Sequence, residues 1–291
     1  MYSGSIVAIV TPMTETGEVD YAAWERLLGW HLAEGTDGIV VCGTTGESPT
    51  VTLVEALELT RRAVARVAGR IPVIAGSGTN DTAGSIERTR ALAAAGADAV
   101  LVVTPYYNRP TQEGLYQHFM AIADDSPVPV ILYNVPGRTG VDLLPETAAR
   151  LGKHPRIVAF KEAVAGVERV RALRSLCGED LDLLSGDDST ALDAMLAGAR
   201  GVISVTANVC PAAMSAVCAA ALAGDAEAAR AADAPLRALH SALSIEPNPI
   251  PAKWAVCRLG LAGTGIRLPL TPLTVAAQVA VLAAMSAAGV A

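Results

Sequence analysis

The order of apolar and amphipathic segments constrains this fold more than any other feature of the sequence. Eight short runs rich in Val, Ile and Leu alternate with longer segments in which apolar residues recur at helical spacing. Strands that are apolar on both faces are typical of a parallel sheet covered by helices. The strands are predicted at residues 5–10, 38–42, 72–75, 99–103, 130–133, 157–161, 182–185 and 201–205, and the helices between them at 21–34, 53–68, 82–95, 112–123, 167–177, 191–197 and 212–223.

Eight β/α units in a chain of 291 residues favour a (β/α)₈ TIM barrel. An open, doubly wound sheet is the alternative fold for the same alternation. The strand pattern stops after Gly224, and residues 226–244, 251–259 and 273–288 are predicted helices joined by proline-rich segments. We therefore expect a barrel over residues 1–224 that carries the active site, followed by a C-terminal three-helix extension over residues 225–291.

Composition excludes several classes of partner. The chain is 52% hydrophobic, has a net charge of −7 and contains no long basic run, which argues against nucleic acid and anionic membranes. No segment is predicted to span a membrane, and the N-terminus lacks the basic start of a signal peptide. Five cysteines without a Cys-x-x-Cys pair are typical of reduced thiols in a cytoplasmic protein.

Lys161 ends the predicted strand at residues 157–161 (IVAFK), where a barrel strand would deliver it to a buried site. A desolvated lysine has a lowered pKa, and its neutral amine is the nucleophile that forms Schiff bases. The alternative is a structural lysine at the end of the strand that pairs with Glu162 or another acid.

The segment Gly43–Ser48 (GTTGES) follows the second predicted strand and precedes a predicted helix. Its glycines allow close approach of the backbone, and a helix N-terminus offers free N–H groups to a carboxylate or another anion. The alternative is a helix cap made by a Thr or Ser of this segment.

Three tyrosines and an arginine follow the fourth and fifth predicted strands. They are Tyr106, Tyr107, Tyr133 and Arg138. A phenol held in a hydroxyl relay can transfer protons, and the planar guanidinium of arginine suits a carboxylate. Half-buried tyrosines that only pack and satisfy their hydroxyls are the alternative.

No metal site is predicted. Asp187 and Asp188 follow the seventh strand at the start of a predicted helix, which makes either one a candidate N-cap. His31, His118, His154 and His240 are scattered, and no two of them have the spacing of metal ligands.

Several motifs together give the chain a strong resemblance to a known family. They are GTTGES at 43–48, YYNRP at 106–110, YNVPGRT at 133–139, the strand ending in Lys161, LSGDD at 184–188 and EPNPIP at 246–251. With these motifs the sequence resembles the dihydrodipicolinate synthase family of the pyruvate-dependent class I aldolase (N-acetylneuraminate lyase) superfamily. The resemblance covers nearly the whole chain.

The resemblance implies a reaction and a set of roles. Lys161 would form a Schiff base with pyruvate, and the derived enamine would attack L-aspartate 4-semialdehyde to give 4-hydroxy-tetrahydrodipicolinate, the committed step of the diaminopimelate route to L-lysine. Tyr133 would transfer protons and Thr44 would link it to Tyr107, which would reach in from a neighbouring subunit of a homotetramer. The implied substrate-binding residues are Thr45, Arg138, Gly186 and the carbonyl of Ile203.

The family's lysine-binding allosteric cleft is expected to be degenerate. Ser48, Asn80 and Tyr106 remain, but Gly84 stands where lysine-inhibited relatives carry a glutamate, and Leu53 and Ala56 replace histidines. Without that carboxylate the ammonium of the effector loses a contact worth roughly 1.5–3 kcal/mol. We expect L-lysine to inhibit weakly or not at all.

Three other functions stay open at this point. A lyase acting on N-acetylneuraminate or a 2-keto-3-deoxy sugar acid would use the same Schiff base, although Arg138 argues against it. A pyridoxal phosphate or phosphate-binding barrel would use Lys161 differently. A non-catalytic regulator would have lost Lys161, Tyr133 or Arg138, and all three are present. The condensation of pyruvate with L-aspartate 4-semialdehyde that the resemblance implies needs no metal or pyridoxal phosphate.

Overall fold

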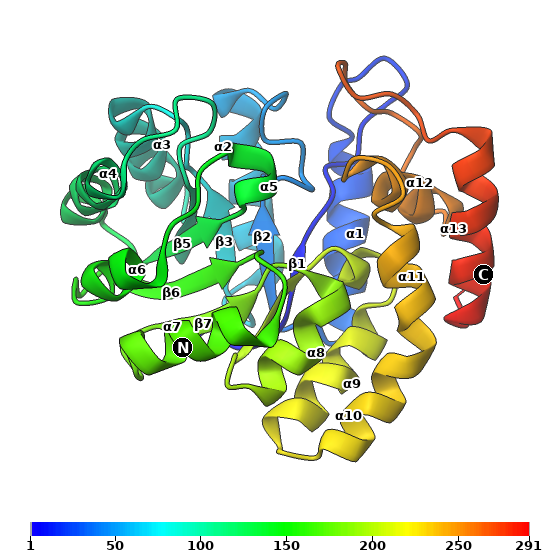
Figure 1. Ribbon diagram of the computed structural model, residues 1–291. Coiled ribbons are helices and arrows are strands. Elements are labelled where there is room, and N and C mark those ends of the chain that lie inside the picture. The colour runs from blue at the N-terminus through cyan, green and yellow to red at the C-terminus, as the bar shows by residue number, and fades with distance from the viewer. Residues whose placement is uncertain (1, 291) are drawn as a thin grey trace.

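Eight parallel strands close into a barrel in which each strand pairs with its neighbours in sequence and β8 pairs with β1 (Figure 1). The computed structural model describes residues 2–290. The strands are β1 Gly4–Ala8, β2 Gly38–Val41, β3 Val73–Gly76, β4 Ala99–Val103, β5 Val130–Asn134, β6 Ile157–Glu162, β7 Asp182–Ser185 and β8 Gly201–Ser204. The predicted TIM barrel is confirmed, and the open doubly wound sheet is wrong.

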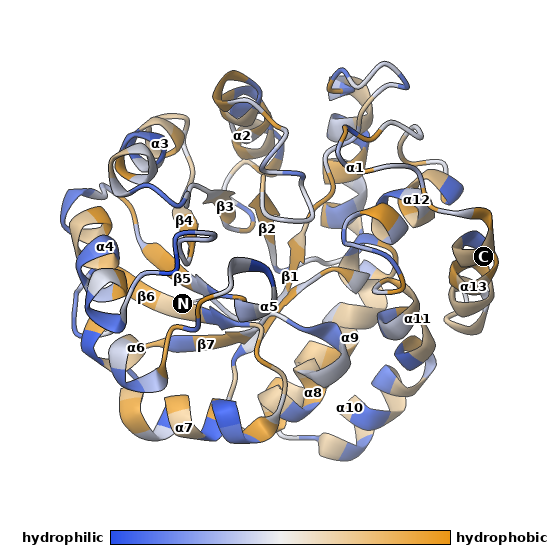
Figure 2. Ribbon diagram, turned by 45° about the horizontal axis from the view of Figure 1, so that its top comes forward, coloured by the Kyte–Doolittle hydropathy of each residue, from blue (hydrophilic) through white to orange (hydrophobic). Residues whose placement is uncertain are grey.

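Alternate residues of each strand face the barrel interior and the surrounding helices, because side chains alternate along a strand. The interior is filled by a compact apolar cluster that includes Ile6, Ile74, Ile131 and Leu184. A larger apolar cluster fills the layer between the strands and the helices. Figure 2 shows hydrophobic colour on the strands and hydrophilic colour mainly on the outer helices and loops.

The first four helices of the barrel each begin at a side-chain cap. Asp20, Thr52, Asp81 and Thr111 each accept a hydrogen bond from a backbone N–H of the helix that follows. The helices are α1 Tyr21–Ala33, α2 Leu53–Val67, α3 Thr82–Ala94, α4 Gln112–Asp125, α5 Pro136–Thr139, α6 Pro145–Leu151, α7 Val167–Cys177, α8 Asp188–Leu196 and α9 Pro211–Leu222. Helices α5 and α6 were not predicted, because they are four and seven residues long and too short to show a helical period.

The C-terminal extension packs on one flank of the barrel, and α13 is its outermost helix (Figure 1). It comprises α10 Ala226–Asp233, α11 Arg237–Ala242, α12 Ile250–Arg258 and α13 Val275–Ala287. The single helix predicted over 226–244 is wrong, because a 3₁₀ turn at Ala234–Leu236 interrupts it. Pro235 lies in this turn and has no N–H to continue the helical hydrogen bonds.

None of the helices within residues 2–290 is long and apolar enough to cross a lipid bilayer.

Acid should destabilise the fold through His31, which is fully buried in α1 and bonds Thr36 through Nδ1. Burial lowers the pKa of His31 from 6.5 to about 3. The unfolded chain therefore takes up this proton near pH 6.5 while the folded chain does not, and stability falls as pH drops from about 6.5 towards 3. The contribution is about 1.4 kcal/mol per pH unit in that window. Urea unfolding of wild type and His31→Gln at pH 7.5 and 5.0 measures it. If the free energy of unfolding fell equally in both proteins between pH 7.5 and 5.0, the assignment to His31 would be contradicted.

Candidate active site

Lys161 and Tyr133 lie side by side at the carboxyl end of the barrel. They are paired residues of β6 and β5, and the Lys161 amine lies 4.2 Å from the centre of the Tyr133 ring. Each residue is only 6% exposed. Among residues 2–290, Lys161 makes no ion pair, so the alternative in which it pairs with Glu162 is wrong. A buried amine without a counter-ion next to a phenol suits nucleophilic and proton-transfer chemistry.

Gly186 leaves the space that the Lys161 side chain occupies. A Cβ atom at position 186 would lie 3.0 Å from Cε of Lys161 and 2.9 Å from Cβ of Ala163. The backbone N–H of Gly186 also donates to the carbonyl of Glu162 at 2.7 Å, which ties the loop after β7 to the end of β6. Any side chain at this position would press on the lysine.

A cavity of about 460 Å³ opens beside this pair. Its lining includes Thr44, Tyr133 and Arg138, which come from the ends of β2 and β5 and from α5. Three of the predicted residues therefore line one cavity. Lys161 is not among its lining residues, but its amine lies against the Tyr133 ring. No hydrogen bond joins Thr44 to Tyr133 within residues 2–290, although both line the same cavity. Ile203 is buried in the barrel interior with Tyr133.

The GTTGES segment does not sit at a helix start, which corrects the expectation from sequence. It forms a series of tight turns, and α2 begins only at Leu53, with Thr52 and Glu55 as the capping pair. The alternative, a helix cap made by a Thr or Ser of residues 43–48, is therefore also wrong. The Thr45 side chain, 2% exposed, accepts a hydrogen bond at 2.9 Å from the Nδ2 atom of Asn248.

A buried ion pair connects the turn at residues 43–48 to the C-terminal extension. Glu47 has a positive φ of 57° and bonds the amine of Lys253 in α12. The second oxygen of Glu47 accepts from the Arg267 backbone N–H at 3.2 Å. Burial lowers the pKa of Lys253, and the neighbouring carboxylate opposes this shift. This pair could not be predicted from sequence, because its partners are 206 residues apart.

Lysine is scarce in this chain, which makes Lys161 stand out. The sequence contains three lysines: Lys153, Lys161 and Lys253. Lys153 is exposed and Lys253 is paired with Glu47. Lys161 alone combines burial with an amine that has no ion-pair partner within residues 2–290.

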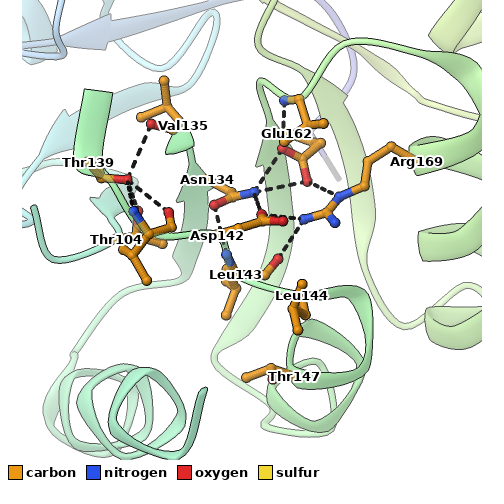
Figure 3. Close-up of polar contacts among 12 residues, drawn as sticks. Thr104, Asn134, Val135, Thr139, Asp142, Leu143, Leu144, Thr147, Glu162 and Arg169 are labelled. Carbon is orange, nitrogen blue, oxygen red and sulfur yellow. Dashed lines mark hydrogen bonds and ion pairs between the residues drawn. The ribbon is translucent and has the colours of Figure 1, made fainter. Parts of the chain in front are cut away.

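A polar network on the outer side of the strands fixes the ends of β5 and β6 (Figure 3). The Asn134 amide donates to Glu162 at 3.0 Å and to Asp142 at 2.7 Å. Arg169 of α7 bridges the same two acids at 2.8 and 2.7 Å. Burial raises the pKa of Glu162, while Arg169 opposes the shift. Because Asn134 and Glu162 directly follow Tyr133 and Lys161, the network holds the reactive pair in register.

The two aspartates after β7 form hydrogen bonds within and between the neighbouring loops. Asp187 occupies the N-cap position of α8, but its carboxylate accepts from the Thr190 hydroxyl at 2.8 Å and caps no backbone N–H. Asp188 accepts from the backbone N–H groups of Val205 and Thr206 at 2.8 and 2.9 Å, which joins the loops after β7 and β8. Within residues 2–290, no three His, Cys, Asp or Glu side chains are arranged to hold a metal ion.

Tyr107 lies outside the cavity of its own chain. Its side chain is 89% exposed, and its backbone has a positive φ of 75°. The N–H of Tyr107 donates to the Thr139 carbonyl at 3.2 Å, so its loop is anchored beside α5. The Tyr107 side chain is therefore accessible to another molecule at this surface.

The predicted allosteric residues lie only partly together. Ser48 and Tyr106 line the cavity, whereas Asn80 and Gly84 are not among its lining residues. The Asn80 carbonyl accepts from the Asn108 amide at 2.8 Å. Gly84 lies in the first turn of α3, where its N–H is capped by Asp81. The weak response to L-lysine stays a prediction.

Comparison with known proteins agrees with this geometry. The model of the "Dihydrodipicolinate synthetase family" matches residues 1–288. A 4-hydroxy-tetrahydrodipicolinate synthase of Alcanivorax borkumensis is 55% identical over 278 residues, which is 96% of this chain and 95% of the relative. The crystal structure of a chloride-inhibited dihydrodipicolinate synthase from Acinetobacter baumannii, complexed with pyruvate, is 50% identical with a TM-score of 0.99 and full coverage of both chains.

A second solved structure, described as the first monomeric dihydrodipicolinate synthase variant, is 41% identical with a TM-score of 0.97. It matches 100% of this chain, and the match covers 98% of that structure. Identities of 50% and more over nearly the whole length, together with the matching family model, are far above what a shared barrel alone produces. The chain belongs to the dihydrodipicolinate synthetase family.

Proposed function

We propose that this protein condenses pyruvate with L-aspartate 4-semialdehyde to give 4-hydroxy-tetrahydrodipicolinate, in the diaminopimelate route to L-lysine. The observation that carries the proposal is the buried Lys161 amine, which has no ion pair within residues 2–290 and lies 4.2 Å from the Tyr133 ring beside the cavity. The family membership and the relatives' names support this reaction over other Schiff-base chemistry.

The Lys161 amine attacks the ketone carbon of pyruvate, and water leaves as the imine forms. Tyr133, beside the amine, passes protons and removes one from the pyruvate methyl group to give the enamine. The enamine carbon then attacks the aldehyde of the semialdehyde. The amine of that substrate closes the ring at the imine carbon and releases Lys161. The protonated imine between Lys161 and pyruvate serves as the electron sink, so the proposed reaction needs no metal and no pyridoxal phosphate.

Two carboxylates must be bound, and we assign one group to each of them. Thr45 and the turn around it are assigned the pyruvate carboxylate, and Arg138 at the cavity wall is assigned the carboxylate of the semialdehyde. Gly186 keeps the lysine unobstructed, and the carbonyl of Ile203 is assigned to the wall of the site. Thr44 would connect Tyr133 to the phenol of Tyr107.

The decisive assay measures turnover of pyruvate plus L-aspartate 4-semialdehyde with a coupled reductase. N-acetylneuraminate and 2-keto-3-deoxygluconate are offered separately to the same preparation. We expect activity in the first assay only, with a large loss in Arg138→Ala. Cleavage of a sugar acid alone would replace the proposed substrate and keep the Schiff base.

Tyr107 should act from a neighbouring subunit, since its side chain is exposed in its own chain. The proposed assembly is a cytoplasmic homotetramer with about four times the chain mass of 29.8 kDa. Tyr107→Phe is expected to lower kcat on the order of 10²-fold, because the proton relay loses its outer hydroxyl. Tyr116→Phe is the control, since Tyr116 stacks on Arg150 at another surface. Light scattering gives the mass of each protein, and wild-type turnover in Tyr107→Phe would contradict the relay.

A further inference from the structure

Asn248 joins two residues that the proposed function assigns to different substrates. It lies between α11 and α12 in the C-terminal extension, outside the barrel. Its side-chain amide donates to Oγ1 of Thr45 at 2.9 Å, and its backbone carbonyl accepts from the Arg138 guanidinium at 3.3 Å. One residue of the extension therefore contacts both groups assigned to carboxylate binding.

The contact with Thr45 decides the direction of the hydroxyl proton. A threonine hydroxyl has one proton to donate and two lone pairs that accept. Asn248 uses an accepting lone pair, and the Thr45 hydroxyl has no other hydrogen bond within residues 2–290. The proton is therefore free to be donated. A donor is what a carboxylate ligand requires, because an ionised carboxylate only accepts hydrogen bonds.

The side-chain amide of Asn248 is only half satisfied among the described residues, because its nitrogen is hydrogen-bonded to Thr45 and its oxygen is not. The Oδ1 atom of Asn248 is buried and has no hydrogen-bond partner within residues 2–290. Leaving a buried polar atom unpaired is unfavourable. The segment is nevertheless held firmly, because Lys253, five residues later, forms the buried pair with Glu47. The asparagine is thus fixed against Thr45 in spite of an unsatisfied oxygen.

We propose that Asn248 is a positioning residue for carboxylate recognition. Its amide turns the Thr45 hydroxyl proton towards the pyruvate carboxylate, and its backbone carbonyl orients Arg138 for the second carboxylate. This inference rests on the proposed function of the site. The two contacts can be tested separately. A substitution at position 248 removes the side-chain contact with Thr45 and leaves the backbone contact with Arg138.

Kinetics of Asn248→Ala and Asn248→Asp test the proposal. In Asn248→Ala we expect KM for pyruvate to rise about tenfold, the ratio that one lost hydrogen bond to a charged group gives. The kcat and the KM for the semialdehyde should stay within about twofold, because the backbone carbonyl that Arg138 contacts remains. Asn248→Asp should raise KM for pyruvate further, since an aspartate accepts the Thr45 proton and repels a carboxylate.

A double-variant cycle separates positioning from a general structural role. If Asn248 acts through Thr45, adding Asn248→Ala to Thr45→Val should change KM for pyruvate by less than about twofold. Full additivity of the two changes, or an unchanged KM in Asn248→Ala, would overturn the proposal.

Borohydride trapping of pyruvate at rising concentrations gives the same comparison without the second substrate. A pyruvate concentration for half-maximal trapping that is about tenfold higher in Asn248→Ala than in wild type supports the proposal, even if wild type fails to use the semialdehyde. That failure would reject only the proposed function. Equal half-saturation in wild type and Asn248→Ala would reject the role of Asn248.

Discussion

Lys161→Met should lower kcat/KM by on the order of 10⁴-fold or more, because it removes the atom that forms the covalent bond to pyruvate. Methionine has a similar length and suits the apolar surroundings of this 6% exposed position. Among the described residues 2–290 the amine has no ion pair to lose, so the fold should tolerate the change. Steady-state kinetics and borohydride trapping followed by peptide mass analysis measure both parts of the expectation.

The scarcity of lysine makes this test unusually clear. Only Lys153 and Lys253 remain in the variant, and Lys153 is exposed. Lys153→Met is therefore the matched control, with full activity and full trapping expected. Trapped pyruvate on Lys253, or more than a few per cent of wild-type activity in Lys161→Met, would assign the Schiff base to another amine.

Lys253→Met should destabilise the protein by about 3–5 kcal/mol, because it leaves the Glu47 carboxylate buried without its cation. Arg171→Met is the control. Arg171 and Glu168 form an exposed pair on α7, and the loss should stay below about 1 kcal/mol. Urea unfolding at one fixed protein concentration gives both values, since assembly would make stability depend on concentration.

A second substitution tests whether the buried charge is the cause. Glu47→Gln combined with Lys253→Met removes both charges, and we expect it to recover part of the stability lost in Lys253→Met. No recovery would mean that the packing of the Lys253 stem, and not the unpaired carboxylate, dominates. A loss in Lys253→Met as small as that in Arg171→Met would show that water reaches the pair.

The barrel could be predicted from sequence because its signal is local. Each strand is a short continuous apolar run, and each long helix repeats its apolar residues every three to four positions. Helices α5 and α6 escaped prediction, since four and seven residues contain too little of a period. The predicted helix over 226–244 is wrong because the helical pattern continues through Pro235, whereas the proline interrupts the helix itself with a 3₁₀ turn.

Part of the site was also predictable, because the carboxyl ends of parallel barrel strands meet at one face. Lys161, Tyr133, Thr44 and Arg138 lie at or just after strand ends. Three of them line one cavity, and Lys161 lies against Tyr133. The partner of Glu162 could not be predicted. It depends on which side of β6 each residue faces, and the outward face directs Glu162 to Arg169 and away from Lys161.

The sequence by itself determined the strands, the long helices and the chemical types of the groups at the strand ends, all of which depend on neighbours within a few residues. Tertiary structure alone decided that Lys253 supports Glu47 and that Asn248 bonds Thr45, across 206 and 203 residues of chain. Contacts of this kind leave no periodic pattern in the sequence. They arise when a closed barrel and its C-terminal helices pack together and bury polar groups that must then find partners.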